Sequence, residues 1–583
     1  MDNHPSESLA ERTFQYQSSM PSLPVPSLEM SLSKYLNAVR PFAREDEFKA
    51  TVDIVRTFQE GVGKELHHKL LQRAETKKNW LEEWWLDAAY LEVRVPSQLN
   101  VNFCGPAPYL EHCWPPEEGT QLQRASISTW HTLQYWDLIR TLPPQKSGNT
   151  VLDMDQFRML FNTCKVPGVK KDTIRNYFKT EREGPCPSHL IVICRGRIFT
   201  FDAVCDGQIL TPPELLRQLI YVKQCCEGEP EGDGVAALTS EERTRWALAR
   251  EHLISIDPQH NGTILETIQS SLFVVSLDET TPYSTPDNYT SLTTEALTGN
   301  PAIRWGDKSY NALSFADGTF GSTCDHAPYD GIVLISMCWH LDQKIKDTEG
   351  KWRGSETVRP VPRPEEMVFT VDEKVHSDIR HAKRQYYESA QDMQIVCYAF
   401  TAFGKAAIKQ KKLHPDTFVQ LAMQLAYQKM HKRPGSCYET AMTRKFYHGR
   451  TETMRPCTQE AVNWFSACLK ICSFDRHLLG LYLIAKEEGQ PTPELFLDPL
   501  YAKSGGGGNF VLSSSLAGYT TVLGAGAPMV HRGYGFFYRI RDDRIVVSIS
   551  AWKSCRETDA ASLFNNFCSS LHEMFHLATT SQL

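Results

Sequence analysis

Short apolar runs bounded by turn residues alternate along the chain with longer segments of helical character. Residues 190–194 (Leu-Ile-Val-Ile-Cys) and 198–201 (Ile-Phe-Thr-Phe) flank an Arg-Gly-Arg turn, which predicts two paired strands. Residues 271–276 predict another buried strand, and residues 509–515 predict a strand that ends in three hydroxyl groups. Helices are expected over residues 40–95, 241–253 and 375–403, with a short helix within 463–472. The tryptophans of residues 80–86 (Trp-Leu-Glu-Glu-Trp-Trp-Leu) are interpreted as core residues.

Proline-rich segments divide the chain. Residues 21–28 (Pro-Ser-Leu-Pro-Val-Pro-Ser-Leu) are expected to be extended, because each proline fixes its own φ and restricts the residue before it. A helix is expected to open at residues 31–36, and the prolines of residues 358–364 indicate a domain boundary. A chain of 583 residues is too long for a single hydrophobic core. We expect an extended and helical lead-in over residues 1–95, an N-terminal catalytic domain over 96–365 and a C-terminal domain over 366–583.

The composition is that of a soluble globular protein, with 41% hydrophobic and 22% charged residues. The net charge of −7 gives no reason to expect a nucleic-acid partner, and no apolar run approaches the length of a membrane span. Asp2, Glu7 and Glu11 outnumber Arg12 at the N-terminus, so neither a mitochondrial presequence nor a secretory signal is expected. The 17 cysteines include no C-x-x-C pair, which favours free thiols over disulfides or a metal site.

The strongest candidate for chemistry is the hexapeptide His326-Ala327-Pro328-Tyr329-Asp330-Gly331. A neutral imidazole can take a proton from a hydroxyl or thiol group near neutral pH. Asp330 can bind nearby backbone or an arginine, and Gly331 permits a tight turn. A surface turn that contains a histidine by chance explains the hexapeptide equally well when it is considered alone. The residues upstream decide between the two, because Arg-Trp-Gly-Asp-Lys-Ser-Tyr at 304–310 and Phe-Ala-Asp-Gly at 315–318 lengthen the pattern far beyond a chance match.

The stretch 304–331 resembles the second signature of the choline/carnitine acyltransferase family, with Ala312 where the family has a larger apolar residue. Residues 20–30 resemble the first signature of that family, Leu-Pro-x-x-Pro-x-Pro-x-Leu, with Met20 and Met30 as departures. The resemblance runs from Met20 to the C-terminus. It implies an α/β fold of two domains like chloramphenicol acetyltransferase, each with a central mixed β-sheet and flanking helices, and an active site at the domain interface.

The resemblance also assigns the catalytic residues. It implies that His326 is the general base, which deprotonates the hydroxyl of carnitine or, in reverse, the thiol of coenzyme A. Ser515 ends a Ser-Ser-Ser segment that matches the family's Ser-Thr-Ser, and its hydroxyl is expected to stabilise the oxyanion. Asp330 is expected to belong to the same catalytic group. The transfer implied is direct, without an acyl-enzyme.

Residues 405–412 contain four lysines, a run that by itself is typical of a solvated face. In the family, lysines at two of these positions hold the 3′-phosphate of coenzyme A. Lysine charges suit a phosphate group, and no Walker-type loop competes for that role. The coenzyme A-binding residues that the resemblance implies are Lys405, Lys409, Gln410, Lys411, Lys412, Leu413, His414, Pro415 and Asp416.

The pocket implied for carnitine is formed by Tyr438, Thr440 and Thr451, with Arg476 to pair with the substrate carboxylate. Relatives that use choline lack this arginine, because choline has no carboxylate, so the sequence favours carnitine. The segment between Thr453 and Phe474 is much shorter than in the family, and its effect on the position of Arg476 is open. Gly524 falls where members specific for short chains carry a bulky residue, which implies room for a medium-length acyl chain.

The C-terminal tripeptide Ser581-Gln582-Leu583 is close to the peroxisomal address Ser-Lys-Leu. It implies import by the peroxisomal receptor and a location in the peroxisomal matrix. The expected function is reversible transfer of an octanoyl-like group between coenzyme A and L-carnitine by a monomer, with coenzyme A as a cosubstrate and no tightly bound cofactor. Two alternatives stay open: a catalytically impaired relative that only binds acyl-CoA, and an acyltransferase of the same fold that uses another alcohol.

Overall fold

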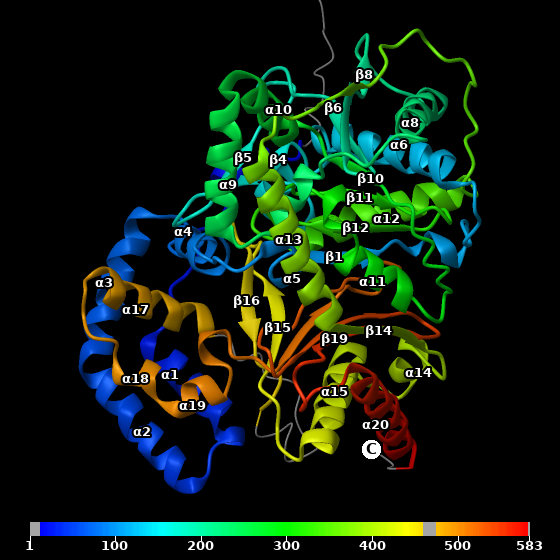
Figure 1. The fold of residues 1–583 in the computed structure, drawn as a ribbon. Coiled ribbons are helices and arrows are strands. Elements are labelled where there is room, and N and C mark those ends of the chain that lie inside the picture. Colours follow the sequence, from blue (N-terminus) through cyan, green and yellow to red (C-terminus); the bar gives the residue numbers. More distant parts are fainter. Residues whose placement is uncertain (1–11, 459–473, 581–583) are drawn as a thin grey trace, which may run out of the picture.

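Two mixed β-sheets form the framework of the protein (Figure 1). The computed structural model describes residues 12–458 and 474–580. In the first sheet, three central strands run parallel and antiparallel strands flank them on both sides. Its strands, in spatial order, are β1 (Phe103–Pro106), β12 (Phe320–Cys324), β11 (Asn311–Ser314), β10 (Val274–Leu277), β6 (His189–Cys194), β7 (Arg197–Asp202) and β13 (Glu365–Glu366).

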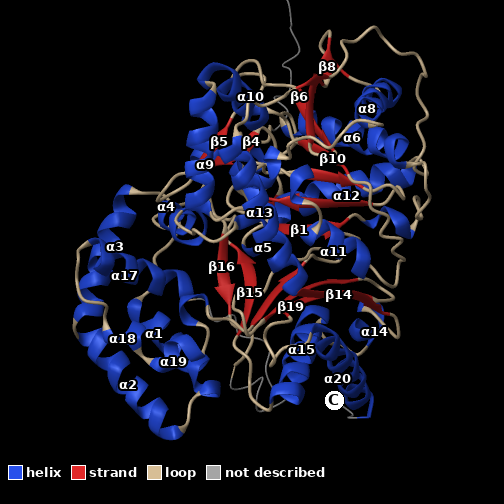
Figure 2. Cartoon of the chain, viewed as in Figure 1, coloured by secondary structure: helices blue, strands red, loops and turns tan. Residues whose placement is uncertain are grey.

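The second sheet repeats this pattern of pairing. Three parallel strands again lie at its centre, with antiparallel neighbours on both sides. Its strands, in spatial order, are β14 (Met393–Phe400), β19 (Ile545–Trp552), β18 (Tyr534–Ile540), β17 (Leu512–Leu516), β15 (Cys437–Met442) and β16 (Thr451–Met454). Helices flank both sheets (Figure 2), so the predicted fold of two α/β units with mixed sheets is confirmed.

Both faces of the first sheet are covered, which explains the unbroken apolar run of β6. Successive side chains of a strand point to opposite faces. Leu190, Val192 and Cys194 pack with α6 (Gln121–Ile139), α8 (Pro212–Cys226) and α12 (Gly331–Asp347). Ile191 and Ile193 pack with α9 (Arg243–Ile256), α10 (Pro258–Ser270) and α13 (Glu373–Asp392). A strand buried on both faces needs no polar alternation.

We call the part of the molecule around the first sheet the first half and the part around the second sheet the second half. One face of the second sheet packs on the first half. Helices α15 (Pro415–His431) and α20 (Ala560–Thr580) cover the other face. Ile395 and Val546, on the joining face, pack with α11 (Thr290–Thr298) and β1 of the first half. Backbone hydrogen bonds reinforce this contact, since Cys104 of β1 donates to Ala525 at 2.9 Å and accepts from it at 2.7 Å. The two halves therefore meet over a packed, hydrogen-bonded seam.

A separate group of helices combines the beginning and the later part of the chain (Figures 1 and 2). Helices α1 (Leu28–Val39), α2 (Glu45–Glu60) and α3 (Val62–Thr76) pack with α17 (Asp475–Glu487), α18 (Glu494–Leu497) and α19 (Pro499–Lys503). Trp80 and Trp84 are buried in this cluster, so their interpretation as core residues is confirmed. The remaining short elements include α4 (Glu82–Leu86), α5 (Ser97–Asn100), α7 (Asp155–Arg158), α14 (Lys405–Gln410) and three two-stranded ribbons, β2–β3 (Lys146–Ser147, Thr150–Val151), β4–β5 (Thr163–Val166, Thr173–Asn176) and β8–β9 (Val204–Cys205, Gln208–Ile209).

The predicted pair of strands around the Arg-Gly-Arg turn is confirmed as β6 and β7. The helix predicted over residues 375–403 is wrong after Asp392, because residues 393–400 form β14 and pair along their whole length with β19. This segment contains Ile395, Val396, Tyr398 and Phe400, whose branched and aromatic side chains suit a half-buried strand.

The predicted divisions at residues 95 and 365 stay predictions. Val375 and Ile379 of α13 lie in the core of the first half, so the part expected to begin at residue 366 starts with a helix that packs on that half. The short helix predicted within residues 463–472 and the tripeptide Ser581-Gln582-Leu583 lie outside the described residues. Within residues 12–458 and 474–580, we find no helix whose length and apolar character would let it span a membrane.

Candidate active site

His326 lies two residues beyond the end of β12, where the first sheet meets the second half of the chain. Its ring nitrogen Nδ1 is 3.1 Å from the backbone carbonyl oxygen of Tyr329 and 3.5 Å from the hydroxyl of Tyr90. A carbonyl oxygen can only accept a hydrogen bond, so Nδ1 carries the proton and donates. The other ring nitrogen, Nε2, is therefore the one whose lone pair can accept a proton.

The surroundings of His326 favour the neutral imidazole. Burial lowers its pKa below the ordinary value, and the nearby charge of Arg450 lowers it further. The carboxylate of Asp330 acts in the opposite direction, because it stabilises the imidazolium. The net shift is downward, so at neutral pH the ring is unprotonated at Nε2 and available as a base.

Arg450 fixes the loop that carries His326. Its guanidinium donates to the carbonyl oxygens of His326 at 2.9 Å and Ala327 at 2.6 Å. The same group forms an ion pair with Asp330, with Nη2 3.0 Å from Oδ1. Arg450 directly precedes β16, so a residue at the edge of the second sheet positions the loop that carries His326 at the end of β12.

A buried ion pair fixes the loop from its other side. Asp325, the residue before His326, lies 2.9 Å from the ammonium group of Lys165 on β4, and both side chains have zero exposure. Asp325 also accepts a hydrogen bond from the backbone N–H of Ala327 at 3.2 Å. Breaking such a pair from one side leaves a buried charge uncompensated. His326 is thus held between two ion pairs, Lys165–Asp325 and Arg450–Asp330.

The three serines of β17 face alternate directions. The buried Ser514 hydroxyl donates to the carbonyl oxygen of Tyr438 at 2.8 Å and accepts from Gln420 at 3.0 Å. Ser515 points to the opposite face and is half-buried. Over residues 12–458 and 474–580, its hydroxyl forms no hydrogen bond and is free to bind a ligand oxygen.

Arg476, on the first turn of α17, reaches the end of β16. Its Nε atom donates to the carbonyl oxygen of Thr451 at 3.2 Å, and its guanidinium lies 3.3 Å from the centre of a Trp85 ring. Both Arg476 Nη2 and Trp85 Nε1 are buried, and neither has an acceptor among the described residues. A buried donor without a partner is costly, so this part of the site suits an anionic or carbonyl-bearing ligand.

Tyr438 and Thr440 lie two positions apart on β15, so their side chains share one face of the second sheet. The Thr440 hydroxyl donates to the Tyr438 hydroxyl at 3.2 Å. Thr440 pairs in register with Thr453 of β16, on the strand that also carries Thr451. The structure thus brings the predicted carnitine-binding residues to β15, β16 and the adjoining end of α17.

The predicted coenzyme A segment forms α14 and the start of α15. Lys405 and Lys409 are four positions apart on α14 and lie on the same side of that helix. The start of α14 lies close to the backbone of Arg541. Glycine is needed at position 404, because a Cβ atom there would lie 2.4 Å from the carbonyl oxygen of Arg541. Two contacts fix the part of the segment at the start of α15. The His414 ring caps the helix by accepting a hydrogen bond from the N–H of Thr417, and Oδ1 of Asp416 is 2.5 Å from the Tyr538 hydroxyl. Lys411, Lys412 and Leu413 connect the two helices.

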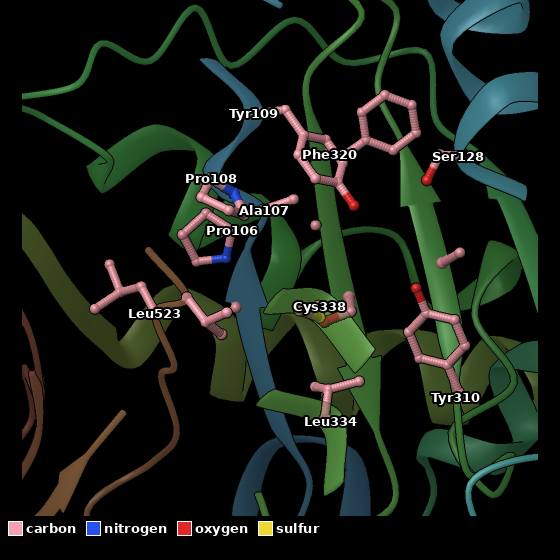
Figure 3. A pocket seen from close by; sticks show the side chains of 15 residues that line it. Pro106, Ala107, Pro108, Tyr109, Ser128, Tyr310, Phe320, Leu334, Cys338 and Leu523 are labelled. Carbon is pink, nitrogen blue, oxygen red and sulfur yellow. The ribbon is translucent and has the colours of Figure 1, made fainter. Parts of the chain in front are cut away.

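A cavity with mainly apolar walls lies between the first sheet, α12 and the loop that follows β17 (Figure 3). The cavity is narrow and partly open to solvent. Ala312 of β11 forms part of its wall, where the family has a larger residue. Leu523 lines it too, and the adjacent Gly524 has space for a Cβ atom, which would lie 3.6 Å from the Phe537 ring. Other lining residues are Pro106, Tyr109, Ser128, Tyr310, Phe320, Leu334 and Cys338.

The sequence profile described as "Choline/Carnitine o-acyltransferase" matches residues 23–473 and 472–573. The chain belongs to the choline/carnitine O-acyltransferase family. The peroxisomal carnitine O-octanoyltransferases of Rattus norvegicus and Homo sapiens are 59% and 58% identical to it, each over 100% of this chain and 100% of the relative. The carnitine O-acetyltransferase of Homo sapiens is 32% identical over 94% of this chain and 92% of the relative. The family that the signatures predicted is confirmed.

The comparisons also bear on the predicted short segment before Arg476. The alignment with the rat relative spans 613 positions, whereas this chain has 583 residues. The relative therefore contains residues without a counterpart here, and the division of the family match at residues 472–473 indicates that a gap falls in this segment. Arg476 nevertheless donates a hydrogen bond to the carbonyl oxygen of Thr451. The shorter segment therefore does not separate these two residues.

Several residues of the site were not predicted. Arg450 and Tyr90 contact the histidine loop, Trp85 contacts Arg476, and Lys165 pairs with Asp325. The only sequence signals were the position of Arg450 beside Thr451 and the aromatic run that contains Trp85. The aromatic run was interpreted as core. This is right for Trp80 and Trp84, whereas Trp85 is only partly buried and also contacts Arg476.

Proposed function

We propose that this chain transfers a medium-chain, octanoyl-like acyl group reversibly between coenzyme A and L-carnitine. The observation that carries the proposal is the hydrogen bond from His326 Nδ1 to the Tyr329 carbonyl oxygen, which leaves Nε2 as a positioned base. Membership of the family and the names of the full-length relatives support the same activity.

The reaction proceeds by direct transfer. His326 Nε2 takes the proton from the hydroxyl of carnitine, and the hydroxyl oxygen attacks the thioester carbonyl of acyl-CoA. Ser515 donates its free hydroxyl to the tetrahedral oxyanion, an interaction that is typically worth about 3–4 kcal/mol. The carbon–sulfur bond then breaks, and the proton on His326 passes to the departing thiolate. Asp330 contributes through its ion pair with Arg450, which fixes the loop of the base.

The carboxylate of carnitine binds at Arg476, with Tyr438, Thr440 and Thr451 around it. The support for this site is the buried Nη2 atom of Arg476, which has no acceptor from residues 12–458 or 474–580. A guanidinium group prefers a carboxylate as its partner. An alcohol without an acidic group would leave this donor unpaired, so the arrangement favours carnitine over choline.

Coenzyme A binds along α14 and the start of α15, where Lys405 and Lys409 face its 3′-phosphate. The acyl chain occupies the cavity lined by Leu523, and the adjacent Gly524 has no side chain that would fill the space beside it. Burial of methylene groups in such a cavity stabilises the bound chain by about 0.8 kcal/mol for each group. The chemistry needs no tightly bound cofactor.

We further propose that the protein acts as a monomer in the peroxisomal matrix. The relatives that are 58–60% identical to it are named as peroxisomal proteins. Ser581-Gln582-Leu583, which lies outside the described residues, is the proposed ligand of the import receptor.

A thiol-release assay tests the activity. The purified chain is mixed with octanoyl-CoA, and free thiol is followed with and without L-carnitine. We expect thiol release that depends on carnitine and that choline does not support. Acyl-CoA binding without carnitine-dependent release would instead identify a catalytically impaired binding protein, and release with a different alcohol would identify another acyltransferase.

A further inference from the structure

A buried phenol lies between two carboxyl groups in the second half of the molecule. The Tyr538 hydroxyl, on β18, is 2.5 Å from Oδ1 of Asp416 and 3.0 Å from Oε1 of Glu439. It is also 2.8 Å from Nε2 of Gln420. Tyr538 is fully buried and Glu439 is 4% exposed. Neither carboxyl group is in an ion pair with a described lysine, arginine or histidine.

The hydrogen-bonding capacity of these groups requires an additional proton. A phenol has one proton to donate and can accept two hydrogen bonds. The Gln420 amide can only donate through Nε2, so it takes one accepting site of Tyr538. The single phenol proton can then serve one carboxylate. The second carboxyl group must be protonated and donate to Tyr538, because two carboxylates facing one proton would repel each other at low dielectric.

Glu439 is the better holder of that proton. It is the more deeply buried of the two, and burial raises its pKa, with the Asp416 charge raising it further. Burial raises the pKa of Asp416 as well, but Asp416 lies at the more exposed start of α15, where the hydrogen bond from Tyr538 and the charge of His414 oppose that rise. A neutral Glu439 donates to Tyr538, and Tyr538 donates to an ionised Asp416.

The same set of bonds continues to the strand that carries Ser515. The second Nε2 proton of Gln420 goes to the Ser514 hydroxyl at 3.0 Å, and Ser514 donates to the carbonyl oxygen of Tyr438 at 2.8 Å. With Glu439 protonated, the phenol proton of Tyr538 is directed to Asp416, while the Gln420 amide also lies within reach of Glu439. The series therefore connects the predicted coenzyme A segment at Asp416 with β17, which carries Ser515, and with β15.

We propose that Glu439 is kept as a neutral acid and acts as a positioning residue, which orients Tyr538 toward Asp416 and fixes the coenzyme A segment to β17. The proposal rests on the proposed function for the role of that segment. Ionisation of Glu439 would offer the phenol proton two anionic acceptors and push Asp416 away from Tyr538. The titratable groups that face this pair are Asp416 at the start of α15, His414 at its N-cap, Cys437 of β15, Tyr538 of β18 and Tyr519 of the loop between β17 and β18.

An infrared titration tests the proton directly and does not depend on turnover. In a difference spectrum of the wild-type protein minus Glu439→Gln at neutral pH, we expect the C=O stretching band of a protonated carboxyl group. Alkaline titration should replace that band with carboxylate bands. A spectrum without the band, or a band that is equally strong in Glu439→Gln, would overturn the assignment of the proton to Glu439.

Kinetics test the positioning role. Glutamine keeps a neutral donor at position 439, whereas alanine removes it, so Glu439→Gln and Glu439→Ala are matched variants. We expect the KM for octanoyl-CoA of the wild type to rise about tenfold on alkaline titration, the effect of weakening one charge-assisted hydrogen bond. Glu439→Gln should show no such rise, and Glu439→Ala should have the raised KM at neutral pH, while kcat and the KM for carnitine change less than about twofold.

Two results would contradict the positioning role: an alkaline rise in KM that persists in Glu439→Gln, or a KM for Glu439→Ala that equals that of the wild type. Thermal unfolding of each variant separates these outcomes from a damaged fold. A wild-type protein without carnitine-dependent turnover would contradict the proposed function and leave the infrared titration to decide on the proton.

Discussion

The guanidinium of Arg450 pairs with the carboxylate of Asp330, and the same guanidinium donates to the backbone carbonyl of His326. Asp330 belongs to the loop after β12 of the first sheet, and Arg450 precedes β16 of the second. The proposed base is thus fixed by a contact between the two halves of the chain. A change in how the halves pack would move His326 relative to both substrates.

Asp330→Asn should shift the acid limb of kcat/KM to lower pH. The Asp330 carboxylate stabilises the imidazolium and raises the pKa of His326, whereas burial and Arg450 lower it. Removal of the carboxylate charge therefore lowers that pKa further, and the base stays unprotonated at more acid pH. The pH dependence of kcat/KM with octanoyl-CoA measures the shift. An acid limb that stays in place or moves to higher pH would exclude this role for Asp330.

The same variant should unfold more readily. The Arg450 charge would be left buried without its partner, a change that typically costs about 3–5 kcal/mol. Urea denaturation measures the loss, and Asp330→Asn combined with Arg450→Met should recover part of it, because the unpaired charge is then absent.

His326→Ala should remove turnover while leaving acyl-CoA binding in place. General-base catalysis typically raises the reaction rate about 10²–10⁴-fold. His326 is also the proposed acceptor of the proton from the carnitine hydroxyl, so its loss removes that acceptor. The thiol-release assay measures kcat, and equilibrium titration with octanoyl-CoA measures binding. A variant that keeps a tenth of the activity would show that another group serves as the base.

Replacement of both Lys405 and Lys409 by alanine should raise the KM for coenzyme A and leave the KM for dephospho-CoA unchanged. The two ammonium groups lie on one side of α14, where they can face one phosphate. The ratio of the two KM values isolates the 3′-phosphate, since all other parts of the ligands are identical. Equal losses for both ligands would mean that these lysines do not bind that phosphate.

What could be predicted from the sequence depended on how local each signal was. The apolar run 190–194 predicted β6 because burial on both faces leaves a continuous mark in the chain. Residues 393–400 were assigned to a helix because their strand is defined by pairing with β19, more than 140 positions later. The contact of Tyr90 with His326 joins residues 236 positions apart, and no pattern within either segment records it. The family resemblance supplied the proposed base, the oxyanion donor and Asp330, whereas Arg450 and Lys165, which fix the loop of the base, came from the structure alone.

Ala312→Leu should reduce the length of acyl chain that the enzyme accepts. Ala312 lines the apolar cavity, and leucine adds carbon atoms to the space that the end of an octanoyl chain would occupy. Exclusion of two methylenes costs about 1.6 kcal/mol, or about fifteenfold in kcat/KM for octanoyl-CoA. Acetyl-CoA serves as the control, because its acyl group is too short to reach Ala312. An unchanged kcat/KM for octanoyl-CoA would show that the chain lies elsewhere.

Gly524→Met tests the same cavity at the position next to Leu523. Gly524 adjoins Leu523, which lines the cavity, and a Cβ atom at Gly524 would lie at ordinary contact distance, 3.6 Å from the Phe537 ring and 3.8 Å from the Cys104 carbonyl oxygen. Gly524→Ala should therefore fold and act normally, which makes it the matched control. A methionine would extend into the path of the acyl chain, and exclusion of four or so methylenes costs roughly 3 kcal/mol in transition-state binding. We expect kcat/KM for octanoyl-CoA to fall by about a hundredfold with acetyl-CoA unaffected. Parallel losses for both substrates would indicate a damaged fold, and no loss for either would place Gly524 outside the acyl path.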